Sequence, residues 1–277
     1  MLNNKLGFVF TNFNNANYTI NAVKSLQKES NEEQIQIVVV DNNSEKNDIE
    51  TLKSFQKNNL SVEVIFSDQN VGYFKGLNIG IRHIRENYPQ INCLIVGNND
   101  VLFPENFYDS IFLNKDLILK YPVISPDIVT SDGFHQNPHV VERISKIREL
   151  FYDLYHSNYT IAKLIIRFAK VTHKFTRRKD EDNFEKAGEI YQGYGACYIL
   201  TPRFFDLFEE LYSPTFLMYE EYFLAKQLFE KGHKVFYEPS INITHLMHAT
   251  TDKLPGKLKW KFSKESHIEY RKDIKII

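Results

Sequence analysis

The chain has 277 residues, of which 43% are hydrophobic and 25% charged, and its formal net charge is -1. This length and composition suit one large globular domain with a full core. The balanced charge argues against nucleic-acid binding through bulk charge, which usually needs a basic excess. Cys93 and Cys197 lack the paired spacing of a disulfide framework or a thiolate metal site. Because no signal peptide or membrane-spanning apolar run is evident, we expect a cytoplasmic protein with at most peripheral membrane contact.

The first hundred residues alternate between strand-like and helix-like patterns. Apolar or β-branched runs predict four strands, at 6–11, 35–41, 62–66 and 93–97. Helical spacing predicts helices between them, at 18–27, 49–55 and 72–86. Repeated strand–helix–strand crossovers predict an α/β fold with a mostly parallel, twisted sheet flanked by helices.

Beyond residue 100 the pattern becomes irregular through four prolines, Pro104, Pro122, Pro126 and Pro138. Later patterns predict a strand at 196–201, helices at 204–212 and 218–231, and short strands at 235–237 and 241–244. The second of these helices has Gly232 directly after it, as is common at helix ends.

The segment from Val140 to Lys179 interrupts this alternation. It is helical in pattern and increasingly basic, and its apolar residues fall near one helical face. Two interpretations remain open: a basic amphipathic helix that lies on an anionic membrane, or a helix packed on the domain with solvated charges. The lysine-rich segment 253–277, which contains Trp260, Phe262 and Tyr270, could extend the same basic face.

Polar side chains follow each of the four predicted N-terminal strands. They are Thr11–Asn14, Asp41–Ser44, Asp68–Asn70 and Asn98–Asp100. Ligands of open α/β sheets bind at the carboxyl ends of the strands, so these groups predict a binding edge. Asp100, at the end of a buried strand, suits a metal-bound phosphate, although a turn cap before Pro104 would use the same residue type. Asp41 is a candidate acceptor for a ribose or a base, with a loop cap as the alternative.

The segment Asn70–Gly80 carries glycines at 72, 76 and 80, which recur at helical spacing. A face without side chains lets a ligand or another backbone segment come close. The segment is not a dinucleotide-binding loop, because the glycine spacing differs and it follows the third strand rather than the first.

Taken together, these motifs resemble those of family-2 glycosyltransferases. The matching strings, in the family's order, are Thr11-Asn12-Phe13-Asn14, Val40–Ser44, Asn70-x-Gly72-x-x-x-Gly76-x-Asn78-x-Gly80, Asn98-Asn99-Asp100, Gly195-Ala196-Cys197 and Tyr219-Glu220-Glu221. The resemblance covers most of the chain outside the basic insertion and is similar to the rhamnosyltransferase-like branch that builds bacterial surface polysaccharides. It implies the glycosyltransferase A fold, a sugar-nucleotide donor such as a UDP- or dTDP-sugar, a divalent cation and inversion at the anomeric carbon.

Carried onto this sequence, the resemblance implies a donor site at the strand ends and the glycine segment. Its members would be Thr11, Asn12, Asn14, Asp41, Asn43, Asn70, Gly72, Phe74, Gly76, Asn78, Asn98 and Asn99. Asp100 would bind Mg²⁺ or Mn²⁺. The family's metal motif is usually Asp-x-Asp, whereas here Asn98 replaces the first carboxylate. An amide oxygen can still bind such a cation when donor phosphates supply further ligands.

Glu220 and Glu221 match the acidic pair that the family places beneath the acceptor. The acceptor hydroxyl must lose a proton as it attacks, so a base is required there, and we assign Glu221 to that role. Repulsion from Glu220 would raise the proton affinity of Glu221. The alternative is that both acids only favour a helix N-terminus. Phe223 stands where the family often has a further acid, which leaves the acceptor type open.

Two histidines, His245 and His248, follow the last predicted strand, and Thr250 lies close behind. In relatives a histidine after this strand closes the metal or phosphate site, so His245 is a candidate metal ligand. A core or loop role is the alternative for both histidines. Aromatic residues near the acidic pair are candidates for stacking on a sugar, although most should be core: Tyr191, Tyr194, Phe216, Tyr219 and Tyr222.

We therefore expect an inverting transfer of a hexose or deoxyhexose to a lipid-linked glycan. The expected divisions are a nucleotide-sugar-binding half (1–139), the basic insertion (140–185), an acceptor half of the same domain (186–252) and a basic aromatic tail (253–277). A nucleotidyltransferase is the first alternative, but residues 11–17 lack the glycine and basic residues that hold a triphosphate. A non-catalytic nucleotide-sugar-binding or membrane-docking protein is the second. It is favoured by Asn98 and opposed by the intact acidic pair.

Overall fold

The computed structural model describes residues 2–28, 33–59, 61–142, 144–176, 180–246 and 256–274, without the side chains of 169–176 and 181. The strands are β1 (Leu6–Asn12), β2 (Ile35–Asp41), β3 (Val62–Phe66), β4 (Leu94–Asn98), β5 (Val101–Leu102), β6 (Val123–Thr130), β7 (Gly188–Ile190), β8 (Cys197–Leu200) and β9 (Val235–His245). The helices are α1 (Ala16–Gln27), α2 (Lys46–Lys57), α3 (Tyr73–Asn87), α4 (Phe107–Leu113), α5 (Lys115–Lys120), α6 (Lys146–Ser157), α7 (Tyr159–Thr176), α8 (Pro202–Leu207), α9 (Glu220–Phe229) and α10 (Gly256–Asp273), with a 3-10 turn at Asp180–Asn183.

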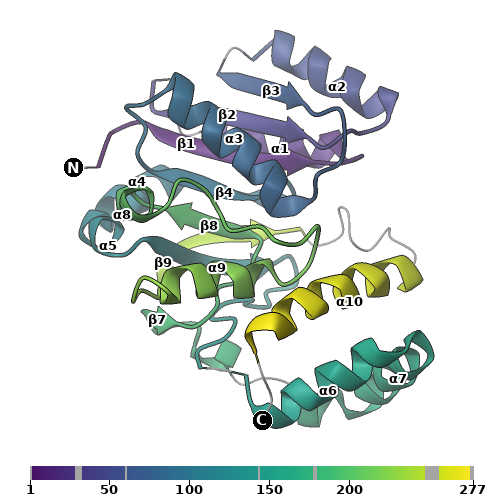
Figure 1. Ribbon diagram of the computed structural model, residues 1–277. Helices are drawn as coiled ribbons and strands as arrows, with labels where there is room; N and C mark the ends of the chain where they lie inside the picture. The colour runs from purple at the N-terminus through teal and green to yellow at the C-terminus, as the bar shows by residue number, and fades with distance from the viewer. Residues whose placement is uncertain are drawn as a thin grey trace.

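One sheet runs through the whole molecule, in the order β3-β2-β1-β4-β8-β6-β9-β5, with β7 paired to β9 (Figure 1). The four N-terminal strands are parallel, as predicted. β8 is antiparallel to both neighbours, β4 and β6, whereas β6 and β9 are parallel. The α/β class is therefore confirmed.

Alternation along β1 divides the core into two layers. Phe8 and Phe10 pack with Phe103 and Phe107 on the face covered by α1 and α4. Val9 points to the opposite face, into the layer formed by α3, α8 and α9. Successive strand residues point to opposite faces, so one strand serves both layers. The carboxyl ends of β1 and β4 consequently finish side by side, with Thr11 opposite Asn98.

The second half departs from the sequence prediction in several places. The proline-containing stretch after residue 100 is irregular only in part, because α4, α5 and the central strand β6 lie within it. Pro126 is tolerated in β6 because the register with β9 shifts directly after it. The two short strands predicted at 235–237 and 241–244 are one strand, β9. The predicted helix 204–212 ends at Leu207, so the following segment is a loop.

The segment that interrupts the sequence pattern is helical, as predicted, but it forms two helices, α6 and α7, that pack on each other. The C-terminal tail was not predicted as a helix, and it forms α10. Figure 1 shows α10 between α9 and the α6–α7 pair. This position makes α10 the link between the insertion and the rest of the domain.

Candidate functional site

A pocket of about 600 Å³ opens at the carboxyl edge of the sheet. Four groups of residues line it: residues at the ends of strands, the start of α3, the loop before α9 together with the acidic pair in its first turn, and α10. They are Thr11, Asn12, Phe13, Asn42, Asn70, Gly72, Tyr73, Asn98, Asn99, Asp100, Tyr194, Gly195, Ala196, Phe216, Leu217, Met218, Glu220, Glu221, His245, Leu258, Lys259 and Phe262. The pocket thus joins residues that are as far as 251 positions apart in the sequence.

The acidic pair lies at the first turn of α9. Glu220 is buried, and its Oε1 atom has no hydrogen-bond partner in the described part of the chain. Glu221 accepts a hydrogen bond from the N–H of Gly195, at 3.2 Å from its Oε1. Both carboxylates line the pocket. The pair therefore offers one carboxylate restrained by Gly195 and one with an oxygen that has no hydrogen-bond partner among the described residues.

Burial governs the protonation of this pair. It raises the pKa of Glu220 to about 8, with repulsion from Glu221 as the second cause. Burial also raises the pKa of Glu221, while the Gly195 N–H opposes that rise. The repulsion expected to act on Glu221 thus falls on Glu220. A pKa of about 8 favours the protonated form of Glu220 at neutral pH.

The backbone before the pair is strained. Met218 and Tyr219 have φ angles of 75° and 67°, a region that residues with a side chain seldom occupy. Such conformations persist only where surrounding contacts hold them, and they are common at functional sites. Here the hydroxyl of Ser266 on α10 donates to the carbonyl of Leu217 at 2.6 Å. The acidic pair is therefore held by contacts from outside its own helix.

Asp100 and His245 form a second ionisable pair in the same pocket. Oδ1 of Asp100 lies 3.2 Å from Nε2 of His245, and both side chains are buried. The other ring nitrogen, Nδ1, lies 2.7 Å from Oε1 of Gln136. An Nδ1–H donated to this amide oxygen leaves the Nε2 lone pair directed toward Asp100, which is the arrangement of a metal-binding histidine.

Asp100 and His245 supply part of a binding site for a divalent cation. No group of three or more His, Cys, Asp or Glu side chains suited to a metal occurs within the described ranges. Asp100 and His245, with the side-chain amide of Asn98 beside them, supply an incomplete shell. Mg²⁺ commonly takes one or two protein ligands and completes its shell with substrate phosphates. The residues present therefore suit a cation that arrives with a diphosphate.

The remaining predicted donor residues divide into pocket wall and support. Thr11, Asn70, Gly72 and Asn98 lie on the wall. Asn12 and Asn99 also reach it, but their amides hold the strand ends together: Asn12 donates to Asp41 at 2.8 Å, and Asn99 donates to Thr19 at 2.7 Å. These buried amide contacts fix the edge on which a ligand would lie.

Several predicted donor residues do not line this pocket. Asp41 is fully buried, with its carboxylate accepting from Asn12 and from the N–H of Ser44. Asn14 and Asn43 occupy left-handed turn positions. Phe74 lies in the core, Asn78 bonds to Leu211, and Gly76 allows α3 to approach Thr11. Their roles in donor binding stay predictions. His248 and Thr250 fall outside the described residues.

The pocket wall also contains residues of α10, for which the sequence predicted no role in the site. Leu258, Lys259 and Phe262 come from α10, and Phe262 packs on Phe216 with ring centroids 5.0 Å apart. Among the aromatic candidates, Tyr194 and Phe216 line the pocket, whereas Tyr219 and Tyr222 pack on Tyr270. The spacing of four between Leu258, Phe262 and Ser266 was the available signal, since it places them on one helical face.

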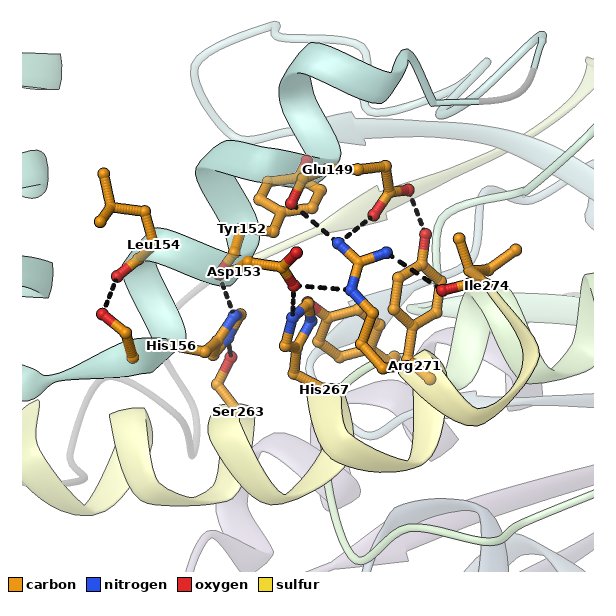
Figure 2. A network of polar contacts seen from close by, with 12 residues as sticks. Glu149, Tyr152, Asp153, Leu154, His156, Ser263, His267, Arg271 and Ile274 are labelled. Carbon is orange, nitrogen blue, oxygen red and sulfur yellow. Dashed lines mark hydrogen bonds and ion pairs between the residues drawn. The ribbon is translucent and has the colours of Figure 1, made fainter. Parts of the chain in front are cut away.

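A partly buried polar network joins α10 to α6 (Figure 2). His267 lies 2.8 Å from the carboxylate of Asp153 through Nε2, and 2.9 Å from the hydroxyl of Tyr219 through Nδ1. Arg271 bonds to Asp153 at 2.6 Å and to Glu149 at 2.9 Å. Since Tyr219 directly precedes the acidic pair, this network connects the insertion to the pocket.

The fold matches that of glycosyltransferase A structures. Residues 8–118 match the model of the family described as Glycosyl transferase family 2. A search of curated protein sequences gives no significant match.

Two solved structures illustrate the shared fold. The crystal structure of GalNAc-T7 with UDP, GalNAc and Mn²⁺ matches 97% of this chain and 48% of its own, with a TM-score of 0.61 and 12% identity. The structure of S. aureus TarS 1-349 in complex with UDP-GlcNAc matches 88% of this chain and 59% of its own, with a TM-score of 0.55 and 11% identity. This chain thus spans about half the length of the solved structures that it matches.

Proposed function

We propose that this protein is an inverting glycosyltransferase that moves a hexose or deoxyhexose from a nucleoside diphosphate to a hydroxyl of a glycan. One observation carries the proposal: the acidic pair and the Asp100–His245 pair line the same pocket. The first pair can accept a proton, and the second can hold a cation on a diphosphate. The family 2 domain match and the UDP-containing structural neighbours support the same donor class.

The proposed reaction is a single in-line displacement. Glu221 takes the proton of the acceptor hydroxyl as its oxygen forms a bond to the anomeric carbon. The bond from that carbon to the diphosphate oxygen breaks on the opposite face, and the electron pair leaves with the nucleoside diphosphate. A bound cation would neutralise charge on the leaving diphosphate. Asp100 and His245 would hold it, and Gln136 would keep the imidazole oriented.

The finer assignments follow from the sequence resemblance. We propose a lipid-linked acceptor in bacterial surface-polysaccharide synthesis, which would place the protein at the inner face of the cell membrane. Among the described helices, none combines the length and apolarity needed to cross a bilayer. Any attachment by this part of the chain would therefore have to be peripheral.

The test begins with the donor. Purified protein is screened by thermal shift against UDP-, dTDP- and GDP-sugars, each with and without Mn²⁺, because a ligand of the native state raises its apparent stability. A shift that requires both one nucleotide class and Mn²⁺ is the expected result. Absence of a shift with every donor would contradict the proposal.

The base is tested by Glu221→Gln, which we expect to lower turnover by about 10²–10⁴-fold while donor affinity stays nearly unchanged. Glu230→Gln, at the exposed far end of α9, is the matched control and should retain full turnover. Near-normal turnover of the Glu221 variant would remove Glu221 as the base.

A non-catalytic nucleotide-sugar binder is the second candidate. It is favoured by Asn98, which leaves Asp100 as the only carboxylate in the Asn98–Asp100 motif. The two candidates separate in one experiment, since a binder would show the donor-dependent thermal shift without release of nucleoside diphosphate in any acceptor mixture.

A further inference from the structure

Helix α6 buries a polar side and exposes an apolar side, which is the reverse of an ordinary surface helix. Three of its charged and polar side chains face the domain: Glu149 and His156 are buried, and Asp153 bonds to α10. Its large apolar side chains face outward, at positions 147, 150, 151 and 154, with exposed fractions of 70%, 56%, 56% and 46%. Figure 2 shows the polar side chains pointing toward α10 and Leu154 pointing away from it.

The spacing of these outward residues is that of one helical stripe. Ile147, Leu150, Phe151 and Leu154 recur at intervals of three, four and seven, which places them along a single side of α6. Because α10 meets the opposite, polar side, this stripe buries no surface against it. An exposed row of large apolar side chains is informative in a way that a single one is not.

The neighbouring helix continues the exposed apolar surface. On α7, Leu164, Ile166 and Phe168 are 59%, 43% and 72% exposed. Together the two helices carry half of the exposed large apolar side chains found in the described chain, although residues 146–168 are a small part of it. We call residues 146–168 the hairpin, and this concentration marks it as an interaction surface.

The charge around the hairpin is strongly one-sided. From Tyr155 to Lys179 the sequence contains no Asp or Glu and seven Lys or Arg residues. Two of these, Lys163 and Arg167, are exposed on α7 beside the apolar residues. An apolar stripe flanked by basic side chains is the composition of helices that lie in the headgroup region of anionic membranes.

Charge also distinguishes the two most obvious occupants. In a symmetric dimer the same patch meets itself, so the exposed Lys163 and Arg167 of the two copies would be brought together and would repel. An anionic bilayer instead supplies apolar chains for the stripe and negative headgroups for the lysines and arginines. We propose that the hairpin docks this protein on an anionic membrane surface, with the outward residues of α6 and α7 in the headgroup–acyl boundary.

This surface is coupled to the pocket through α10. One part of α10 bonds to α6 through His267 and Arg271, and another part lines the pocket with Leu258 and Phe262. The lipid-linked acceptor rests on the proposed function, and membrane docking would bring such an acceptor within reach. Docking itself requires no transfer activity, so the two proposals can be tested separately.

The experiment is flotation of the full chain with two kinds of vesicle: phosphatidylcholine alone, and phosphatidylcholine mixed with phosphatidylglycerol. We expect flotation only with the anionic vesicles, and release as salt is raised. The test variant is Leu150→Glu/Phe151→Glu, which changes only exposed positions and should lower the bound fraction by at least about tenfold. The control is Leu113→Glu on α4, a residue that is 85% exposed and lies outside the hairpin.

Three outcomes would overturn the docking proposal. The first is the absence of flotation with anionic vesicles, and the second is equal flotation of the double variant and the control. The third is a dimer in solution that the double variant dissociates, which would assign the stripe to a second copy. The donor-dependent thermal shift is measured on the same samples. A protein that floats but shows no shift with any donor would retain the docking surface and contradict the transferase.

Discussion

The hydroxyl of Tyr219 lies 2.9 Å from Nδ1 of His267, which joins the residue before the acidic pair to the C-terminal helix. Tyr219 is in the left-handed region, at φ 67°, and no glycine relieves the strain. The imidazole is fixed in turn by Asp153, 2.8 Å from Nε2. Burial lowers the pKa of His267. The neutral ring can therefore accept a hydrogen bond from the Tyr219 hydroxyl through Nδ1 while its Nε2–H donates to Asp153.

Tyr219→Phe should therefore lower kcat more than it weakens donor binding. The variant removes the hydrogen bond that helps to hold the strained residue, and a buried bond of this kind contributes about 1 kcal/mol to stability. Measurement of kcat, KM for the donor and melting temperature separates positioning from simple destabilisation. Tyr270→Phe is the matched control, because its hydroxyl bonds to Glu149 in the same network. Equal loss of kcat in both variants would show that Tyr219 has only a structural role.

The Asp100–His245 pair predicts a cation-dependent step in donor binding. His245→Gln should remove most of the gain in donor affinity that Mn²⁺ produces, while metal-free affinity changes little. Calorimetric titration of the donor, with and without Mn²⁺, measures this difference. His135→Gln is a useful comparison, since His135 forms a similar pair with Asp127, at 2.8 Å, away from the pocket lining. A Mn²⁺ effect that survives in the His245 variant would exclude this histidine as a ligand.

Ionisation of the buried Glu220 makes the stability of the folded protein fall as the pH rises from about 4.5 to about 8. Its pKa is raised from 4.5 to about 8 in the folded state by burial and by Glu221. A raised acid pKa contributes stability that is fully present below pH 4.5 and is lost as the pH rises through about 8. The free energy of unfolding should therefore decrease across this window. Urea titrations of the wild type and Glu220→Gln test this, because the variant cannot ionise and its curve should be flatter. Parallel curves would contradict the burial argument.

His156 has the opposite effect on the pH dependence of stability. Burial and the neighbouring His267 lower its pKa to about 4, so the neutral ring is favoured in the folded state. Its contribution to stability is present above pH 6.5 and is lost as the pH falls toward 4. The same urea titrations, extended to His156→Gln, should show a smaller loss of stability on the acid side. If the variant and the wild type lose the same stability below pH 6.5, the ring is protonated in the folded protein.

The N-terminal half was predictable because its signals are local. The apolar runs at β2 and β3 match the structure residue for residue, since continuous β-branched strands of a buried parallel sheet leave a distinct pattern. The polar cluster from Asn98 to Asp100 could be placed at the sheet edge for the same reason. What the pattern did not reveal is that Asn99 bonds to Asn12, Asn15 and Thr19, because these contacts depend on how α1 packs.

The second half was less predictable because long-range contacts decide it. Pro126 suggested irregular backbone, yet β6 is central, and only the register shift against β9 explains how it accommodates the proline. The sequence predicted that the tail extends the basic face of the insertion. Burial of His267 and Tyr270 instead makes it a packed helix that lines the pocket. In α6 the rule that a surface helix buries its apolar side was misleading, since the polar side is the buried one.

Gly72 should be the most sensitive glycine at the pocket. Its φ angle is 91°, and a Cβ atom there would lie 2.1 Å from the carbonyl oxygen of Phe216. That carbonyl accepts the N–H of Tyr73, so it cannot withdraw without breaking the first contact of α3 with the loop before the acidic pair. Gly72→Ala should destabilise the fold by about 1–3 kcal/mol and reduce turnover through displacement of Phe216. Gly133→Ala is the control: φ is 82° but no atom lies within 4 Å of the added carbon. A similar melting temperature and turnover for both variants would show that backbone strain alone, and not the contact with Phe216, sets the cost.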